Sequence, residues 1–270
     1  MASNLECVGP AVGSRDEFAA LVESALAKAQ PIGSINGFTV HGWQDPSGAR
    51  LVITTKGRKI VDMLPSFAGT PGARLAGLHA ANEEVAIASV VDDSGETLTM
   101  LAAEVEQRRF LSGEAASGQA SIVALGVNVS VHADEHAFAA SDASLLSPGE
   151  DPDEPPAHVV EQGMPWPLRM GAESFISYRV FGRPEQAQAH ARLCGTVLAA
   201  GQRTVAATGQ SFIVARVRTA GFDTDVCLPG TFAVPEPGNI IGGEVFLVAS
   251  MPQLALASGT SRRSWLPWRR

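Results

Sequence analysis

Residues 238–248, GNIIGGEVFLV, close a stretch from 191 to 251 in which five short apolar runs are separated by turn residues. Within this stretch, residues 212–218 and 222–228 place charged side chains between apolar ones, as a strand with one buried face does. Pro229-Gly230 ends the second of these runs, because proline lacks the donor that a strand ladder needs. The stretch therefore predicts a compact set of short strands.

This pattern of runs resembles the OB-like barrels, in which five short strands close into a small barrel. The resemblance covers residues 191–251 alone and carries no functional residues with it. An SH3-like barrel or an open meander would give almost the same pattern. We therefore expect an OB-like module here, with those two arrangements as alternatives.

The N-terminal half predicts one helix followed by strands. Ser14 is suited to cap a helix, Glu17 completes a capping-box pattern, and residues 15–29 carry apolar side chains at helical spacing. The expected strands that follow cover residues 38–43, 50–55, 60–64, 84–91 and 122–131.

A possible internal repeat links the two halves. Residues 64–72, LPSFAGTPG, resemble residues 228–235, LPGTFAVP, and each copy follows two expected strands. Duplication of a β module and chance recurrence in an alanine-rich chain are the two interpretations. The whole sequence predicts a mainly β protein with a few helices (α+β), built from two small β-barrel-like modules, the C-terminal one OB-like.

The clearest boundary is an acidic, proline-rich segment, residues 141–164, which has little apolar surface at its start. We expect it to be a linker or a long loop. On this division, residues 1–140 form a helix plus a β module, residues 165–255 form the OB-like module, and residues 256–270 form a basic tail rich in tryptophan and arginine.

Composition narrows the classes of function. The chain has 270 residues, of which 45% are hydrophobic, and a net charge of −8. That charge repels phosphate backbones and disfavours nucleic-acid binding in general. Three cysteines without a C-x-x-C pair favour neither a disulfide framework nor a zinc ribbon. Arginine far outnumbers lysine, a bias typical of GC-rich bacterial genomes.

The sequence also bears on localisation. The first ten residues lack the charged and apolar regions of a signal peptide. No apolar run approaches the roughly 18 residues of a membrane span. We therefore expect a cytoplasmic protein.

His132 and His136 are the first candidate site, a metal site, with Asp134 and Glu135 between them. On a helix, histidines four residues apart share a face and can bind one metal ion. The preceding run reads as a strand, however, and a strand would separate the two histidines by about 13 Å, too far for one ion. The alternative interpretation is a polar strand end that runs into a solvated turn.

His41 and Trp43 are the second candidate, a ligand-binding surface. On one strand these two side chains and Asp45 point the same way, which would give an aromatic platform beside a histidine and a carboxylate. An exposed strand edge next to a turn is the alternative.

Arg203, Arg216 and Arg218 are the third candidate, a nucleic-acid surface. OB-like barrels bind single strands with basic and aromatic residues on their strand faces. Asp223 and Asp225 lie on the next expected strand and would pair with these arginines as cross-strand neighbours instead.

The tail is the fourth candidate, a partner-binding segment. It carries four arginines, two tryptophans and no acidic residue, a composition suited to a membrane surface or an acidic partner. An unfolded terminus is the alternative. The residues concerned are Arg262, Arg263, Trp265, Trp268, Arg269 and Arg270.

No catalytic motif appears: there is no G-x-S-x-G elbow, no P-loop, and no G-x-G-x-x-G between a strand and a helix. The sequence favours a non-enzymatic protein that acts through protein–protein contacts, as an oligomer or in a larger assembly, without a cofactor. A novel enzyme stays open. A metal-dependent hydrolase using His132 and His136, and single-strand nucleic-acid binding by the C-terminal module, are the alternatives.

Overall fold

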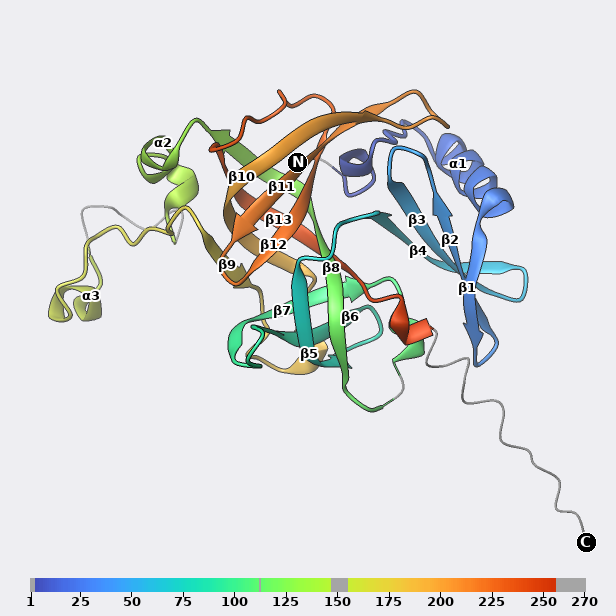
Figure 1. Ribbon diagram of the computed structural model, residues 1–270, viewed down its shortest axis with the longest axis horizontal. Coiled ribbons are helices and arrows are strands. Elements are labelled where there is room, and N and C mark those ends of the chain that lie inside the picture. Colours follow the sequence, from blue (N-terminus) through green and yellow to red (C-terminus); the bar gives the residue numbers. More distant parts are fainter. Residues whose placement is uncertain (1–2, 112, 147–154, 256–270) are drawn as a thin grey trace, which may run out of the picture.

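The computed structural model describes residues 3–111, 113–146 and 155–255, and strands dominate it (Figure 1). The prediction of a mainly β protein with a few helices is confirmed. The strands form two sheets, named sheet A and sheet B here. No helix in the described ranges has the length and apolar character needed to cross a membrane.

Sheet A consists of β1 (Gln30–Ile35), β2 (Phe38–Gln44), β3 (Ala49–Lys56) and β4 (Lys59–Phe67). Sheet B consists of β5 (Ala73–Ala80), β6 (Val85–Val91), β7 (Thr97–Val105), β8 (Ala116–His132), β9 (Ser174–Ser177), β10 (His190–Thr204), β11 (Ser211–Thr219), β12 (Phe222–Pro229) and β13 (Ile240–Ser250). The helices are α1 (Arg15–Lys28), α2 (Glu135–Ala139), α3 (Ala157–Glu161) and the short 3-10 turns η1 (Glu6–Val8), η2 (Arg108–Phe110), η3 (Asp142–Ser144) and η4 (Pro184–Gln186).

The predicted N-terminal helix is present as α1. Its N-cap is Ser14, whose side chain accepts a hydrogen bond from the backbone N–H of Glu17. The Glu17 carboxylate accepts from the N–H of Gly13, one residue before the position expected in a capping box. The helix buries Val22 and Ala25 and contacts β2 of sheet A.

Sheet A is an antiparallel meander in chain order, with the largely buried β3 at its centre. Its two edges are poorly suited to pairing with another strand. β1 carries Pro31 and a bulge next to it. β4 carries Lys59, Pro65 and a bulge at Val61. Proline, lysine and bulges all disfavour edge-to-edge association.

Sheet B is organised around β8 and β13, which pair antiparallel from His132↔Ile240 to Ser121↔Ser250. Because both strands are long, each pairs on its other edge with two different strands in succession. β8 meets β5 and then β12, and β13 meets β10 and then β7. Two closed rings of paired strands result, β8-β5-β6-β7-β13 and β8-β12-β11-β10-β13.

The expectation of five strands in residues 191–251 is wrong in one respect. Residues 190–204 form the single strand β10, which passes through Gly201 and bulges near Leu198, and residues 205–209 form the turn. Gly201 has no positive φ, and the strand continues through it. Only four strands come from the stretch, and β8 completes their ring. An OB-like topology stays a prediction.

The strand pairings also cross the predicted boundary at 141–164, because β8 precedes it and its partners β12 and β13 follow it. The start of this segment is docked on sheet B. Arg192, only 8% exposed, donates to the carbonyl oxygens of Ala143 at 2.7 Å and Leu146 at 3.0 Å. Residues 147–154, at the centre of the predicted linker, lie outside the described residues.

One apolar core runs through both sheets and includes η1. Cys7, Cys194 and Cys227 are all free and buried in the structure. Burial raises the pKa of Cys7 to about 12 and that of Cys194 to about 11. These thiols therefore stay protonated at neutral pH and behave as small hydrophobes.

Candidate functional site

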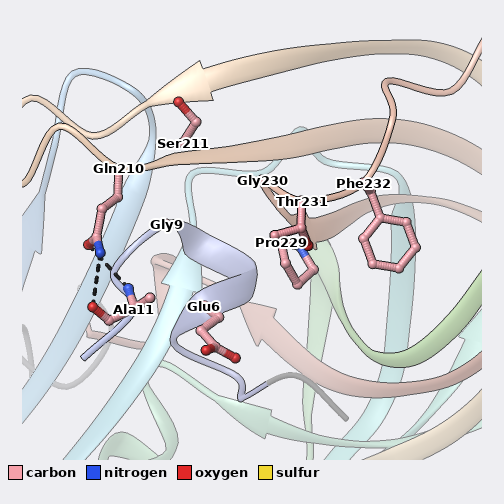
Figure 2. A pocket seen from close by; sticks show the side chains of 9 residues that line it. All are labelled: Glu6, Gly9, Ala11, Gln210, Ser211, Pro229, Gly230, Thr231 and Phe232. Carbon is pink, nitrogen blue, oxygen red and sulfur yellow. Dashed lines mark hydrogen bonds between the residues drawn. The ribbon is translucent and has the colours of Figure 1, made fainter. Parts of the chain in front are cut away.

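Glu6, Gly9 and Ala11 of the N-terminal segment line part of a pocket of about 550 Å³ (Figure 2). The Gln210 side chain holds this segment in place, because its amide accepts from the N–H of Ala11 at 3.1 Å and donates to the Ala11 carbonyl at 2.9 Å. Glu6 and Phe232 also line this pocket. The polar side chains that line this pocket do not converge on one point, so we assign no chemical role to it.

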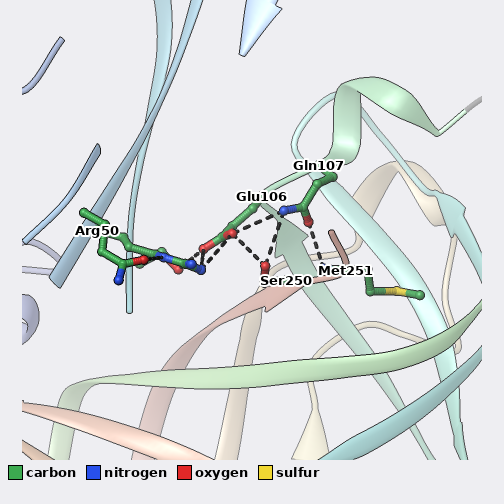
Figure 3. A network of polar contacts seen from close by, with 7 residues as sticks. Arg50, Glu106, Gln107, Ser250 and Met251 are labelled. Atoms are coloured by element: carbon green, nitrogen blue, oxygen red, sulfur yellow. Dashed lines mark hydrogen bonds and ion pairs between the residues drawn. The ribbon is translucent and has the colours of Figure 1, made fainter. Parts of the chain in front are cut away.

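A buried carboxylate lies where the two sheets meet (Figure 3). Glu106 follows β7 and is 4% exposed. Its Oε1 accepts from the Ser66 hydroxyl of β4 at 2.6 Å, and its Oε2 accepts from the Ser250 hydroxyl of β13 at 2.7 Å. The Gln107 amide adds a donor at 3.3 Å, while its oxygen accepts from the N–H of Met251. Three distant segments are thereby joined at one carboxylate.

Arg50 of β3 completes this network. Its Nη1 lies 3.4 Å from both carboxylate oxygens of Glu106, longer than the ~2.7–2.9 Å of a strong charge-assisted bond. Its Nε donates to Oε1 of Gln44 at 2.8 Å. With 29% of its side chain exposed, Arg50 reaches from the buried carboxylate to solvent.

A pocket of about 350 Å³ opens onto this network. Most of its wall is apolar, and Arg50, Glu106 and Gln107 of the network are among its polar lining residues. The lining residues are Gln30, Pro31, Ile32, Gly42, Trp43, Gln44, Arg50, Val52, Glu106, Gln107, Ser250, Pro252 and Ala255. An apolar pocket with a few convergent polar groups is the usual form of a small-molecule site. We name it the inter-sheet pocket.

A group of ion pairs formed by Arg108, Asp62 and Glu104 also joins the two sheets. Arg108 pairs with Asp62 of β4 and, at 3.4 Å, with Glu104 of β7. Burial raises the pKa of Glu104 to about 7, with the negative charges of Asp62 and Glu84 adding to the rise and Arg108 opposing it. Glu104 therefore titrates near neutral pH.

A groove of about 640 Å³ lies on sheet B under the docked start of the 141–164 segment. Its floor is a row of residues in register across four strands, Asn128, Glu244, Arg192 and Ile176. The Tyr178 hydroxyl donates to Glu244 at 3.2 Å, and burial together with that carboxylate raises the pKa of Tyr178. Gly242 and Gly243 also line the groove, so they are part of its wall as well as of β13.

Several large apolar side chains are exposed on the segment that contains α3 and β9. Residues 155–182, named the connecting segment here, hold four of the eleven exposed large apolar side chains of the described chain. They are Val160, Met164, Ile176 and Phe181. Phe181 is 85% exposed and Val160 62%. In Figure 1, α3 of this segment projects away from both sheets.

The structure separates the histidines of the predicted metal site into two elements. His132 ends β8, where its Nε2 lies 2.8 Å from the Ser130 hydroxyl and its ring packs edge-on against Phe138. His136 lies in α2, whose N-cap is Asp134. Burial lowers the pKa of His132. The described ranges contain no cluster of three or more histidine, cysteine or acidic side chains suited to hold a metal ion.

The predicted aromatic surface at His41 and Trp43 is largely covered. Trp43 is 7% exposed, and His41 Nε2 lies 3.2 Å from the Thr55 hydroxyl. Asp45 is buried and accepts from the N–H groups of Ser47, Ala206 and Ala207. It therefore anchors the β10–β11 turn, and Trp43 enters the lining of the inter-sheet pocket instead of an exposed platform.

Two of the three predicted nucleic-acid arginines are paired with acids. Arg216 lies 3.3 Å from Asp225 and 3.7 Å from Asp223, which confirms the expected cross-strand pairing. Arg218 pairs with Glu173 at 2.8 Å rather than with an aspartate of β12. Arg203 is exposed on β10.

The tail residues Arg262 to Arg270 lie outside the described residues. No protein-family model, curated protein or solved structure matches the chain.

Sequence reasoning missed Glu106 and Arg50. Glu106 follows an apolar run and looks like an ordinary strand end, and its partners lie 40, 56 and 144 residues away in the chain. The one available signal was two glutamates and a glutamine, Glu104, Glu106 and Gln107, directly after that run.

Proposed function

We propose that this chain is a non-enzymatic, β-rich protein that acts through protein–protein contacts, with the connecting segment as its contact surface. The observation that carries the proposal is the 85% exposure of Phe181, with Val160, Met164 and Ile176 exposed on the same segment. Exposed apolar surface of this kind is what an interaction site presents, and a partner that covers the connecting segment would bury these side chains.

Burial of these side chains supplies a driving force for association. Covering one fully exposed large apolar side chain contributes roughly 1.5–3 kcal/mol, and because these four are 36–85% exposed, covering all of them provides only part of four such terms before the entropy of association is subtracted. Phenylalanine is the largest of the four and is the natural anchor of such an interface.

The β9 part of the segment is also held against the rest of the protein, which reduces the entropy lost on binding there. β9 pairs with β10 from Ser174 to Ser177, and the hydroxyl of Ser177 accepts from the N–H of Ala102 in β7. The bulges, prolines and lysine on the edges of sheet A favour contact through side chains over strand pairing.

Light scattering after size-exclusion chromatography tests the proposal on the full chain and on a variant without residues 256–270. Self-association gives a mass above that of one chain that increases with protein concentration. If the shortened variant associates equally well, the contact does not need residues 256–270, and a Phe181→Ser variant then tests the connecting segment. A strictly monomeric full chain at all concentrations contradicts the proposal.

A further inference from the structure

Around Arg50 and Glu106, the side-chain acceptors of the inter-sheet pocket already have donors, whereas some of the donors have no acceptor in the described part of the chain. The Glu106 carboxylate accepts from Ser66, Ser250 and Gln107 and has Arg50 nearby. The amide oxygens of Gln44 and Gln107 accept from Arg50 and from the N–H of Met251.

Some hydrogen-bond donors among the lining residues have no partner within the described chain. Among the contacts within the described ranges, Nη2 of Arg50 and Nε2 of Gln44 have no hydrogen-bond partner, and Gln30 makes no side-chain hydrogen bond. The Arg50 guanidinium holds Glu106 only through long contacts on Nη1, so its outer edge is free to make a shorter bond. A planar guanidinium with free N–H groups matches a carboxylate best.

The remainder of the wall is apolar. Ile32, Val52, Pro252 and Ala255 line the pocket together with Arg50. A volume of about 350 Å³ falls at the lower end of the range for small-molecule sites. It has room for a body of roughly one aromatic ring with a short chain.

We propose that the inter-sheet pocket binds a small carboxylic acid with an aromatic or aliphatic body, whose carboxylate contacts Arg50 and whose body packs against Ile32, Val52 and Pro252. This inference does not depend on the contact proposed for the connecting segment, none of whose residues line the inter-sheet pocket. It assigns a ligand-binding site to the junction between the sheets.

Calorimetric titration of the full chain with phenylacetate, phenylacetamide and phenethylammonium tests the proposal. These probes share a ring and differ in the head group. Phenylacetate should bind saturably, phenylacetamide more weakly, and phenethylammonium at least about tenfold more weakly than phenylacetate, because the Arg50 guanidinium repels its charge and the Glu106 carboxylate already accepts from Ser66, Ser250 and Gln107. No saturable phenylacetate binding, or equal binding of the cation, overturns the proposal.

Substitutions of the lining residues test whether phenylacetate binds in the inter-sheet pocket. Arg50→Met should weaken phenylacetate binding about tenfold or more, and Arg50→Lys should weaken it less, because lysine keeps the charge and loses the fork. Ile32→Trp should abolish binding by filling the pocket. Arg218→Met removes an exposed arginine elsewhere and is the matched control, with binding unchanged. If Arg50→Met does not fold, Arg50→Lys and Ile32→Trp still decide, and unchanged binding in both contradicts the assignment.

Discussion

The hydroxyl of Ser66 in β4 donates to Oε1 of Glu106 at 2.6 Å, and this bond joins sheet A to sheet B inside the protein. Ser250 of β13 donates to the other carboxylate oxygen at 2.7 Å. A buried carboxylate with such partners ties together segments that are far apart in the chain, so its removal should loosen the junction between the sheets.

Replacing Glu106 with alanine should lower the free energy of unfolding by about 3 kcal/mol, because Arg50, Ser66 and Ser250 lose their shared acceptor. Ser66→Ala should lower it by about 1–2 kcal/mol. Urea denaturation followed by circular dichroism measures both values. Glu114→Ala is the control, since Glu114 is exposed in a loop and its loss should change stability by less than about 0.5 kcal/mol. A Glu106→Ala effect no larger than that of the control would show that the network does not hold the sheets together.

Stability should depend on pH through Glu104. Its folded-state pKa is raised to about 7 from an ordinary value of 4.5, so the folded protein holds this proton more tightly than the unfolded chain does. The resulting stabilisation is full below about pH 4.5 and is lost as pH rises through about 7, with a total of about 3 kcal/mol.

The comparison that isolates this effect is the wild type against Glu104→Gln. Urea denaturation between about pH 5 and about pH 8 should show the wild type losing stability relative to the variant as pH rises. Asp62, Glu84 and Arg108 are kept in both proteins, so their own titration largely cancels. Parallel pH profiles for the two proteins would contradict the account of Glu104.

Gly72 should not tolerate a side chain. A Cβ at this position would overlap the carbonyl oxygen of Asp223 and the guanidinium of Arg216, because the loop before β5 runs against β12. Gly72→Ala should therefore lower the free energy of unfolding by about 1–3 kcal/mol in urea denaturation. Gly201→Ala is the matched control, since Gly201 has open space around it and no positive φ. Equal stabilities of the two variants would contradict the close approach.

The sequence predicted local structure better than its assembly. Helix α1 and its Ser14 cap follow from capping and apolar spacing, and β2, β3, β11 and β12 follow from alternation and turn residues. β1 and β5 were missed, because Pro31 and Gly77 interrupt their patterns and tertiary pairing overrides that signal. The rings through β8 and β13 depend on pairings between distant segments, which no local pattern specifies.

The candidate site was beyond sequence reasoning for the same reason. Trp43 was singled out, yet as part of an exposed surface, because alternation gives the face of a strand and not what covers it. Arg50 read as an ordinary charged residue near a turn. Its role appears only when β3 is placed against the segment that follows β7 and brings Glu106 within reach.

The central claim is that the connecting segment carries a protein–protein contact. Its most direct test is sedimentation equilibrium of the full chain, of Phe181→Ser, and of Leu98→Ser, which removes a side chain 50% exposed on β7. We expect the wild type to self-associate, Phe181→Ser to weaken association at least about tenfold, and Leu98→Ser to leave it unchanged. A monomeric wild type, or equal association of the wild type and Phe181→Ser, would contradict the claim.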